Sequence, residues 1–135
     1  GMCKGPADME DFQMKFDSLE EQQEDPDSIY NYVKQVIRVR NQNPVIARGT
    51  TAYLEQYSGE QCFALTRSYE GSNLLLLGNT SAEAVSVDLT GLTVGGTTAE
   101  ELVLLGELYT GEETAERAGT VVTLPAYSIL ILGEE

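Results

Sequence analysis

The chain has 135 residues, which fits one domain that could bury roughly two-thirds of the surface exposed by its unfolded form. Twenty-two acidic against 8 basic residues give a formal net charge of −14 at pH 7, and such a surface repels phosphate backbones and anionic lipid. We therefore expect neither a nucleic-acid nor a membrane partner. Histidine, the commonest transition-metal ligand and the only side chain with an unperturbed pKa near neutrality, is absent, and we expect no metal and no cofactor.

Residues 1–27 are acidic and contain few apolar side chains, which predicts a solvated tail. They lack the alternating Asp and Asn oxygens, central Gly and closing Glu of a calcium loop. A disulfide between Cys3 and Cys62 is disfavoured, because Cys3 lies in this tail. We expect no membrane-spanning segment and no signal peptide. The compartment stays open, with a lean toward the extracellular space or the cell envelope.

The residues that flank positions 25–44 predict a helix. Asp25 suits the N-cap, Pro26 the first helical position, and Asp27 adds negative charge to the first turn. Asn43 and Pro44 end the helix, because the residue before a proline avoids the α region.

This helix is apolar on more than one side. One face carries Ile29, Val33, Val36, Ile37 and Arg40. Tyr30, Tyr32 and Val39 lie off that stripe. A helix with an apolar surface wider than one sheet requires is expected to be shared between two bodies.

Short β-like runs separated by turn residues follow Pro44. The predicted strands are 46–50, 52–57, 62–68, 73–79, 84–89, 101–107, 120–124 and 128–132. Several short strands after a single helix favour a mainly β fold, an antiparallel Greek-key β-sandwich of about eight strands with one N-terminal α-helix. We accordingly divide the chain into residues 1–44 and a sandwich domain of residues 45–135.

Four consecutive leucines, Leu74–Leu77, are unusual in a sheet with one wet face. Because a strand alternates its side chains, both faces of this one need cover, and a second sheet of the same chain supplies only one. We therefore expect Tyr30, Tyr32 or Val39, together with one face of the leucine strand, to be exposed or to meet another copy of the chain.

A search for catalytic groups finds none. Acidic pairs such as Glu100-Glu101 and Glu112-Glu113 lie in polar, turn-like segments, where carboxylates keep ordinary pKa values and do not act as glycosidase acids. Serine nucleophiles lack both a G-x-S-x-G elbow and a histidine base. We expect no catalytic residue, and the chain alone is not predicted to be an enzyme.

Tyrosines are the remaining candidates for a sugar-binding surface, because sugar rings stack on exposed aromatic side chains. Tyr53 and Tyr57 lie four residues apart and are therefore expected on the same face of a strand, and Tyr69 and Tyr109 lie near turns. Against this interpretation, half-buried tyrosine is ordinary in sandwiches and tryptophan is absent.

The order of the segments resembles the C-terminal part of family-13 glycoside hydrolases, the α-amylase and oligo-α-glucosidase family. The last barrel helix of that family reads like residues 25–44, DPDSIYNYVKQVIRVRNQNP, and its next strands look like 63–67 and 74–79. The family closes on a Leu-Pro-x-Tyr-Ser-hydrophobic strand, which matches 124–132. Residues 8–16 depart from the basic, proline-containing segment of the family.

The resemblance implies a parent that is a retaining α-glucan hydrolase or transglycosylase, with its catalytic carboxylates on a (β/α)8 barrel. None of those barrel motifs occurs here, so no catalytic role is carried over to any residue. The leading hypothesis is a non-catalytic accessory domain that stabilises the missing barrel of its own parent chain. The alternatives are an α-glucan-binding module that uses Tyr53, Tyr57, Tyr69 or Tyr109, and a free-standing adhesin-like sandwich.

Overall fold

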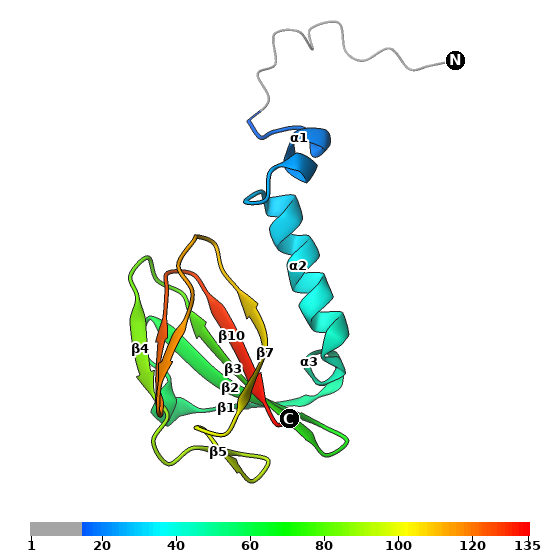
Figure 1. Ribbon diagram of the computed structural model, residues 1–135. Helices are drawn as coiled ribbons and strands as arrows, with labels where there is room; N and C mark the ends of the chain where they lie inside the picture. The colour runs from blue at the N-terminus through cyan, green and yellow to red at the C-terminus, as the bar shows by residue number, and fades with distance from the viewer. Residues whose placement is uncertain (1–14) are drawn as a thin grey trace, which may run out of the picture.

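A computed structural model describes residues 15–135 of the chain. Three helices come first: α1 (Leu19–Glu24), α2 (Ile29–Gln42) and α3 (Pro44–Arg48). Ten strands follow: β1 (Thr50–Tyr53), β2 (Cys62–Tyr69), β3 (Ser72–Asn79), β4 (Val85–Asp88), β5 (Thr93–Val94), β6 (Thr97–Thr98), β7 (Val103–Leu108), β8 (Glu116–Ala118), β9 (Val121–Leu124) and β10 (Ile129–Gly133). A 3-10 turn, Glu55–Tyr57, lies between β1 and β2. Figure 1 shows the helices as one arm beside the strands.

The strands form two facing antiparallel sheets and a short hairpin. One sheet has the order β1-β2-β3-β10-β7, the second has the order β4-β9-β8, and β5 pairs with β6. The chain leaves β3 for β4 in the other sheet and returns from β9 to β10, which pairs with β3. The predicted mainly β, Greek-key sandwich is confirmed, although the described residues contain three α-helices where one was expected.

The inner core lies between the two sheets. Its fully buried side chains come from both, with Leu75, Leu77 and Leu132 on one side and Val122 and Leu124 on the other. Apolar residues at every second position of a strand point toward the same face, so this alternation fills the space between the sheets.

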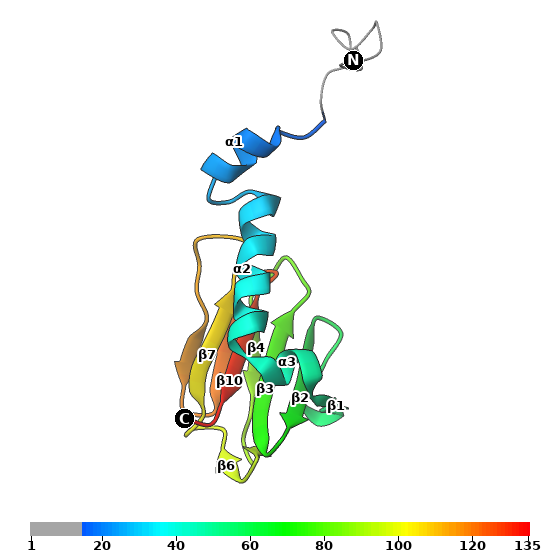
Figure 2. The same ribbon diagram turned by 90° about the vertical axis from the view of Figure 1, so that its right-hand side faces the viewer.

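The outer face of the five-stranded sheet is covered by helices α2 and α3, as Figure 2 shows. Leu74 and Leu76 of β3 point to this side and belong to a second apolar cluster with Val39, Val45 and Ile131. The prediction that one face of the leucine strand stays exposed is therefore wrong. The chain's own helices form a third layer that buries this face.

Helix α2 begins later than predicted. Its N-cap is Ser28, whose hydroxyl accepts a hydrogen bond from the amide of Asn31 at 3.3 Å. Asp25 is instead the C-cap of α1, and its carboxylate accepts from the amide of Asp27 at 2.9 Å. The expected cap at Asp25 is wrong because residues 25–28 make a turn between two helices.

The two apolar sides of α2 have largely the opposite roles from those predicted, and Val36 of the predicted stripe packs on the sheet. Tyr32, Val36 and Val39 pack on the sheet, and Val39 is only 8% exposed. Ile29 and Ile37 of the predicted stripe point to solvent. Two apolar faces are present as expected, but Val39 is buried, and Tyr30 and Tyr32 are half-buried.

Two predicted strands near the start of the sandwich are partly wrong. Most of residues 46–50 lies in helix α3, where Pro44 occupies the first helical position. Of residues 52–57, only Ala52 and Tyr53 lie in β1, and the 3-10 turn contains Tyr57. The remaining predicted strands match β2, β3, β4, β7, β9 and β10 within about two residues at their ends.

Cys62 is half-buried on β2. Cys3 lies outside the described residues, so the pairing of the two cysteines stays a prediction. Residues 1–14 of the predicted tail are likewise not described, and the remainder of it differs from the prediction because it contains helix α1.

Candidate functional site: an exposed apolar stripe on helix α2

Three apolar side chains, one turn apart, point away from the sandwich along α2. Ile29, Val33 and Ile37, the α2 stripe, are 68%, 46% and 52% exposed. Residues at i, i+4 and i+8 lie on one side of a helix, so the three form a continuous row. Tyr30, Lys34 and Gln22 complete an open groove of about 440 Å³ around this row.

Close packing on the other side of the helix fixes the direction of the stripe. Val39 contacts β7 at Gly106, where an added Cβ would come within 2.9 Å of a Val39 methyl group. The carboxamide of Gln35 donates to the carbonyl oxygen of Glu107 at 3.3 Å. These contacts hold one side of α2 against the sheet and leave the stripe to solvent.

The connection between α1 and α2 is also fixed. The carboxamide of Asn31 donates to the carbonyl oxygens of Gln22 at 3.0 Å and Asp25 at 2.7 Å. The Ser28 hydroxyl donates to the carbonyl oxygen of Gln22 at 2.5 Å. Helix α1 therefore has a defined place at the N-terminal end of the stripe.

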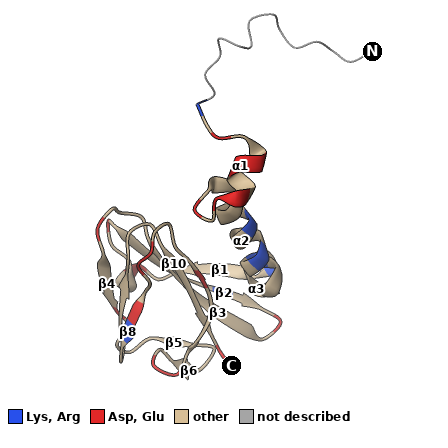
Figure 3. Cartoon of the chain, turned by 45° about the horizontal axis from the view of Figure 1, so that its top comes forward, with Lys and Arg blue, Asp and Glu red and all other residues tan. Residues whose placement is uncertain are grey.

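Charge is distributed unevenly along this arm. Figure 3 shows acidic residues on and after α1 and basic residues farther along the helices. The acidic end contains Glu20, Glu21, Glu24, Asp25 and Asp27, and the basic end contains Lys34, Arg38, Arg40 and Arg48. A surface that joins the stripe therefore meets negative charge at one end and positive charge at the other.

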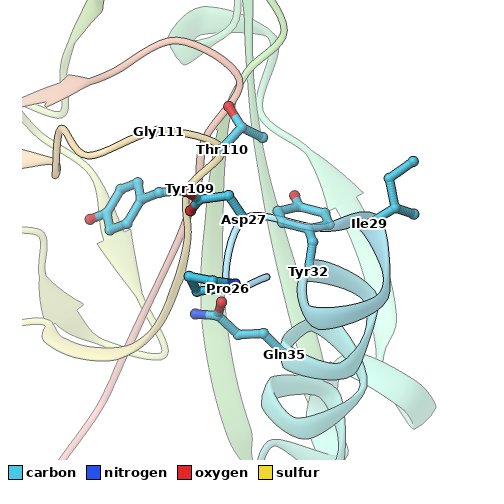
Figure 4. Close-up of a pocket in the computed structure, with 8 residues that line it drawn as sticks. All are labelled: Pro26, Asp27, Ile29, Tyr32, Gln35, Tyr109, Thr110 and Gly111. Atoms are coloured by element: carbon cyan, nitrogen blue, oxygen red, sulfur yellow. The ribbon is translucent and has the colours of Figure 1, made fainter. Parts of the chain in front are cut away.

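A second cavity, of about 390 Å³, lies where the start of α2 meets the loop after β7 (Figure 4). Its wall contains Asp27, Tyr32, Gln35, Tyr109 and Thr110. Part of its polar surface is used within the chain, since Gln35 donates to a backbone carbonyl and the Thr110 hydroxyl donates to that of Ala126. The cavity lies at the junction of helix and sandwich.

The four candidate tyrosines do not form a common platform. Tyr53, at the end of β1, is 61% exposed, whereas Tyr57 packs against the inner core and donates to the carbonyl oxygen of Thr90 at 3.1 Å. The expectation that both lie on one face of a strand is wrong, because the strand ends at Tyr53.

Tyr69 and Tyr109 are held within the fold. Tyr69 packs against the outer cluster beneath the helices. The hydroxyl of Tyr109 donates to the carboxylate of Glu107 at 2.8 Å and accepts from the amide of Ala115 at 2.9 Å. Burial is the main reason that the pKa of Tyr109 is raised, and the carboxylate of Glu107 raises it further. Of the four tyrosines, only Tyr53 is an exposed side chain, and the other three are half-buried.

The acidic groups whose pKa is shifted are moved away from the range of a general acid. Hydrogen bonds from Thr90 lower the pKa of Asp88, and those from Thr98 lower the pKa of Glu101. A glycosidase acid needs a raised pKa, which burial in an apolar site would supply. Within residues 15–135, no group of three Cys, Asp or Glu side chains could hold a metal ion.

Among the helices that the structure describes, none has the length and apolar character to cross a bilayer.

The fold and the site together define a β-sandwich with an attached helical layer, a module whose chief exposed feature is an apolar helix face. No protein-family model and no curated protein matches the chain. Among solved structures, it is similar to Amy13B of Eubacterium rectale, with a TM-score of 0.81, 36% identity, and coverage of 100% of this chain and 25% of that one. This similarity confirms the resemblance to the C-terminal domain of family-13 glycoside hydrolases.

Two further solved structures agree on the fold. Trehalulose synthase MutB from Pseudomonas mesoacidophila MX-45 has a TM-score of 0.65 and 25% identity, with coverage of 84% of this chain and 19% of that one. An α-amylase from H. orenii has a TM-score of 0.66 at 23% identity, with coverage of 87% and 22%, and it supports the fold alone. The chain spans about a quarter or less of each relative, so it corresponds to one part of such enzymes.

Proposed function

We propose that this chain is the non-catalytic C-terminal accessory domain of an α-amylase-family glycoside hydrolase, and that it stabilises the catalytic (β/α)8 barrel of the same parent chain. The observation that carries the proposal is the exposed α2 stripe of Ile29, Val33 and Ile37. Because α2 is already fixed to the sandwich by its other face, a barrel on the stripe would be joined to the sandwich through one shared helix.

The physical gain would come from burial of apolar surface. The three stripe residues are 46% to 68% exposed, and burial of apolar surface stabilises by about 25 cal/mol per Å². A partner that covers the stripe therefore stabilises the protein at little cost in conformational entropy, because Val39 and Gln35 already hold α2 in place.

The first test is genetic. The coding frame upstream of Gly1 should encode a (β/α)8 barrel with the catalytic carboxylates of the family. A frame that starts at Met2 would overturn the proposal in favour of the adhesin-like alternative.

The second test uses the parent enzyme. Val33→Asp should lower its thermal midpoint, because the charge would be buried at the contact between barrel and sandwich. Leu104→Asp is the matched control, since Leu104 is 51% exposed on β7, at the edge of the five-stranded sheet. Equal effects of the two substitutions would refute a specific role of the stripe.

A catalytic role for the chain itself is tested by incubation with maltooligosaccharides. We propose that the purified chain releases no glucose or shorter oligosaccharides. Sustained hydrolysis by a preparation free of other enzymes would contradict a non-catalytic domain.

A second candidate function, α-glucan binding, has one supporting observation, the exposed ring of Tyr53. Titration with maltooligosaccharides distinguishes the two functions. Chemical-shift changes around Tyr53 that Tyr53→Ala removes would support binding, and unchanged spectra at millimolar ligand would support the stabilising role alone.

A further inference from the structure

We propose that the α2 stripe is self-complementary and that the 135-residue chain forms an antiparallel homodimer through it. The occupant is a second copy of the chain, placed so that the two α2 helices run in opposite directions about a two-fold axis at Val33. This inference does not depend on the barrel, which would compete for the same surface in a longer protein.

The spacing of the stripe supports a symmetric contact. Ile29 and Ile37 are each four residues from Val33, and both are isoleucine. In an antiparallel pair centred on Val33, Ile29 of one copy faces Ile37 of the other, and Val33 meets its own symmetry mate. A two-fold interface requires such a surface, in which the same patch serves both partners.

The charges favour the antiparallel direction. Acidic residues gather on α1 and the following turn, at one end of the stripe, and basic residues gather farther along the helices (Figure 3). The acidic end includes Glu20 and Glu24 of α1, and the basic end includes Arg38 and Arg40 of α2. Antiparallel packing places the acidic end of each copy beside the basic end of its partner, whereas parallel packing places like charges together. Complementary potentials of this kind fix orientation, and the opposed helix dipoles add to the preference.

The geometry of the arm leaves room for the partner. Helix α2 is covered by the sandwich on the side of Val36 and Val39, and the groove around the stripe opens away from it. Figures 1 and 2 show no other described element of the chain on the outer side of α2. A second helix can therefore approach the stripe without a change in the sandwich.

Sedimentation velocity of the complete chain over a range of concentrations tests the proposal. We expect a concentration-dependent dimer whose dissociation constant rises at least about tenfold with Val33→Asp and is unchanged by Leu104→Asp. Circular dichroism confirms folding of each variant. A monomer at every concentration, or a dimer that only Leu104→Asp disrupts, would overturn the proposal.

A charge-exchange experiment tests the direction of packing. Arg38→Glu with Arg40→Glu should weaken the dimer, because antiparallel packing places the new carboxylates beside the acidic end of the partner, whereas in a parallel pair they would only replace one like-charge contact by another. The variant with both ends exchanged, Glu20→Lys, Glu24→Lys, Arg38→Glu and Arg40→Glu, should form its own dimer and should pair poorly with the original chain. Preferential pairing of this fully exchanged variant with the original chain would indicate a parallel arrangement and overturn the proposal.

Cross-linking gives a second readout. In a background with Cys3 and Cys62 replaced by Ser, Val33→Cys should form an intermolecular disulfide readily, because only a residue on the axis meets its own copy. Ile29→Cys should cross-link to Ile37→Cys and not to itself. Preferential self-cross-linking of Ile29→Cys would indicate a parallel pair and overturn the proposal. Slow reaction of a monomeric Val33→Cys variant with a thiol reagent would show that another segment of the chain covers the stripe. That result would also overturn the proposal.

Discussion

The side-chain amide of Asn79 donates a hydrogen bond of 3.1 Å to the carbonyl oxygen of Leu124, and so joins the end of β3 to the end of β9 in the opposite sheet. The same amide reaches the carbonyl oxygens of Pro125 at 2.9 Å and Glu83 at 2.7 Å. Its oxygen accepts from the amide of Ser81 at 2.9 Å. One buried side chain thus satisfies backbone groups of two segments, residues 81–83 and 124–125, where the chain passes between the sheets.

Asn79→Ala should lower the free energy of unfolding by about 2–3 kcal/mol, because it leaves buried carbonyl groups without donors. Urea unfolding measures this loss. Asn41→Ala, on the exposed side of α2, is the matched control and should change stability by less than about 0.5 kcal/mol. Equal effects of the two substitutions would contradict the role of Asn79 in the junction.

Gly78 leaves space for the ring of its cross-strand neighbour Phe63. A Cβ at Gly78 would lie 2.1 Å from a ring carbon of Phe63, so Gly78→Ala should destabilise the fold by about 1–3 kcal/mol through overpacking. Phe63→Leu in the same chain should recover part of that loss. Gly111→Ala, where no atom lies within 4 Å of the added Cβ, should have little effect in the same unfolding assay. Additive effects of Gly78→Ala and Phe63→Leu would refute the contact.

Two apolar residues on opposite sides of α2 should respond differently to the same kind of truncation. Val39→Ala removes buried methyl groups from the contact with Gly106 and should cost about 1–3 kcal/mol of stability. Ile37→Ala, on the exposed stripe, should change the free energy of unfolding of the monomer by less than about 0.5 kcal/mol. Measurements on dilute samples avoid any contribution from association. A larger loss of stability for Ile37→Ala than for Val39→Ala would contradict the orientation of α2 described above.

The raised pKa of Tyr109 makes a prediction for alkaline solution. Burial, and then the neighbouring carboxylate of Glu107, hold its pKa above the ordinary value of 10.0, although the amide of Ala115 acts in the opposite direction. The unfolded chain therefore loses this proton first, so stability is fully present below pH 10 and falls as the pH rises toward the folded-state pKa. Denaturant unfolding between pH 9 and 12 should show a smaller loss for Tyr109→Phe than for the original chain. Identical pH profiles would contradict a shift at this residue.

The sandwich could be predicted from sequence because its strands carry a local signal. Val85 and Val87 alternate with polar residues, and the runs around Leu75 and Ile131 are bounded by turn residues. Strands without that signal were missed: β8, Glu116–Ala118, is polar and exposed, and β5 and β6 have two residues each. Pro44, a frequent first helical residue, was the available sign of helix α3.

The candidate site could be predicted only in part. Periodicity indicated that α2 is apolar on two sides, but periodicity does not say which side meets the chain's own sheet. Complementary shape decides which side meets the sheet, since Val39 fits against Gly106 and the α2 stripe has no such partner among residues 15–135. The tyrosines show the same limit, because the separation of Tyr53 from Tyr57 depends on the end of β1, which lies between them.

The seat of α2 on the five-stranded sheet has one more consequence. A sandwich expressed from residue 45 onward would lose the helix that shields Leu74, Ile131 and Leu108 on the outer face. Both faces of that sheet are apolar, and only the inner one would then be buried. An exposed apolar face of this kind promotes aggregation. A fragment that folds without aggregation should therefore include α2, whichever partner covers the α2 stripe.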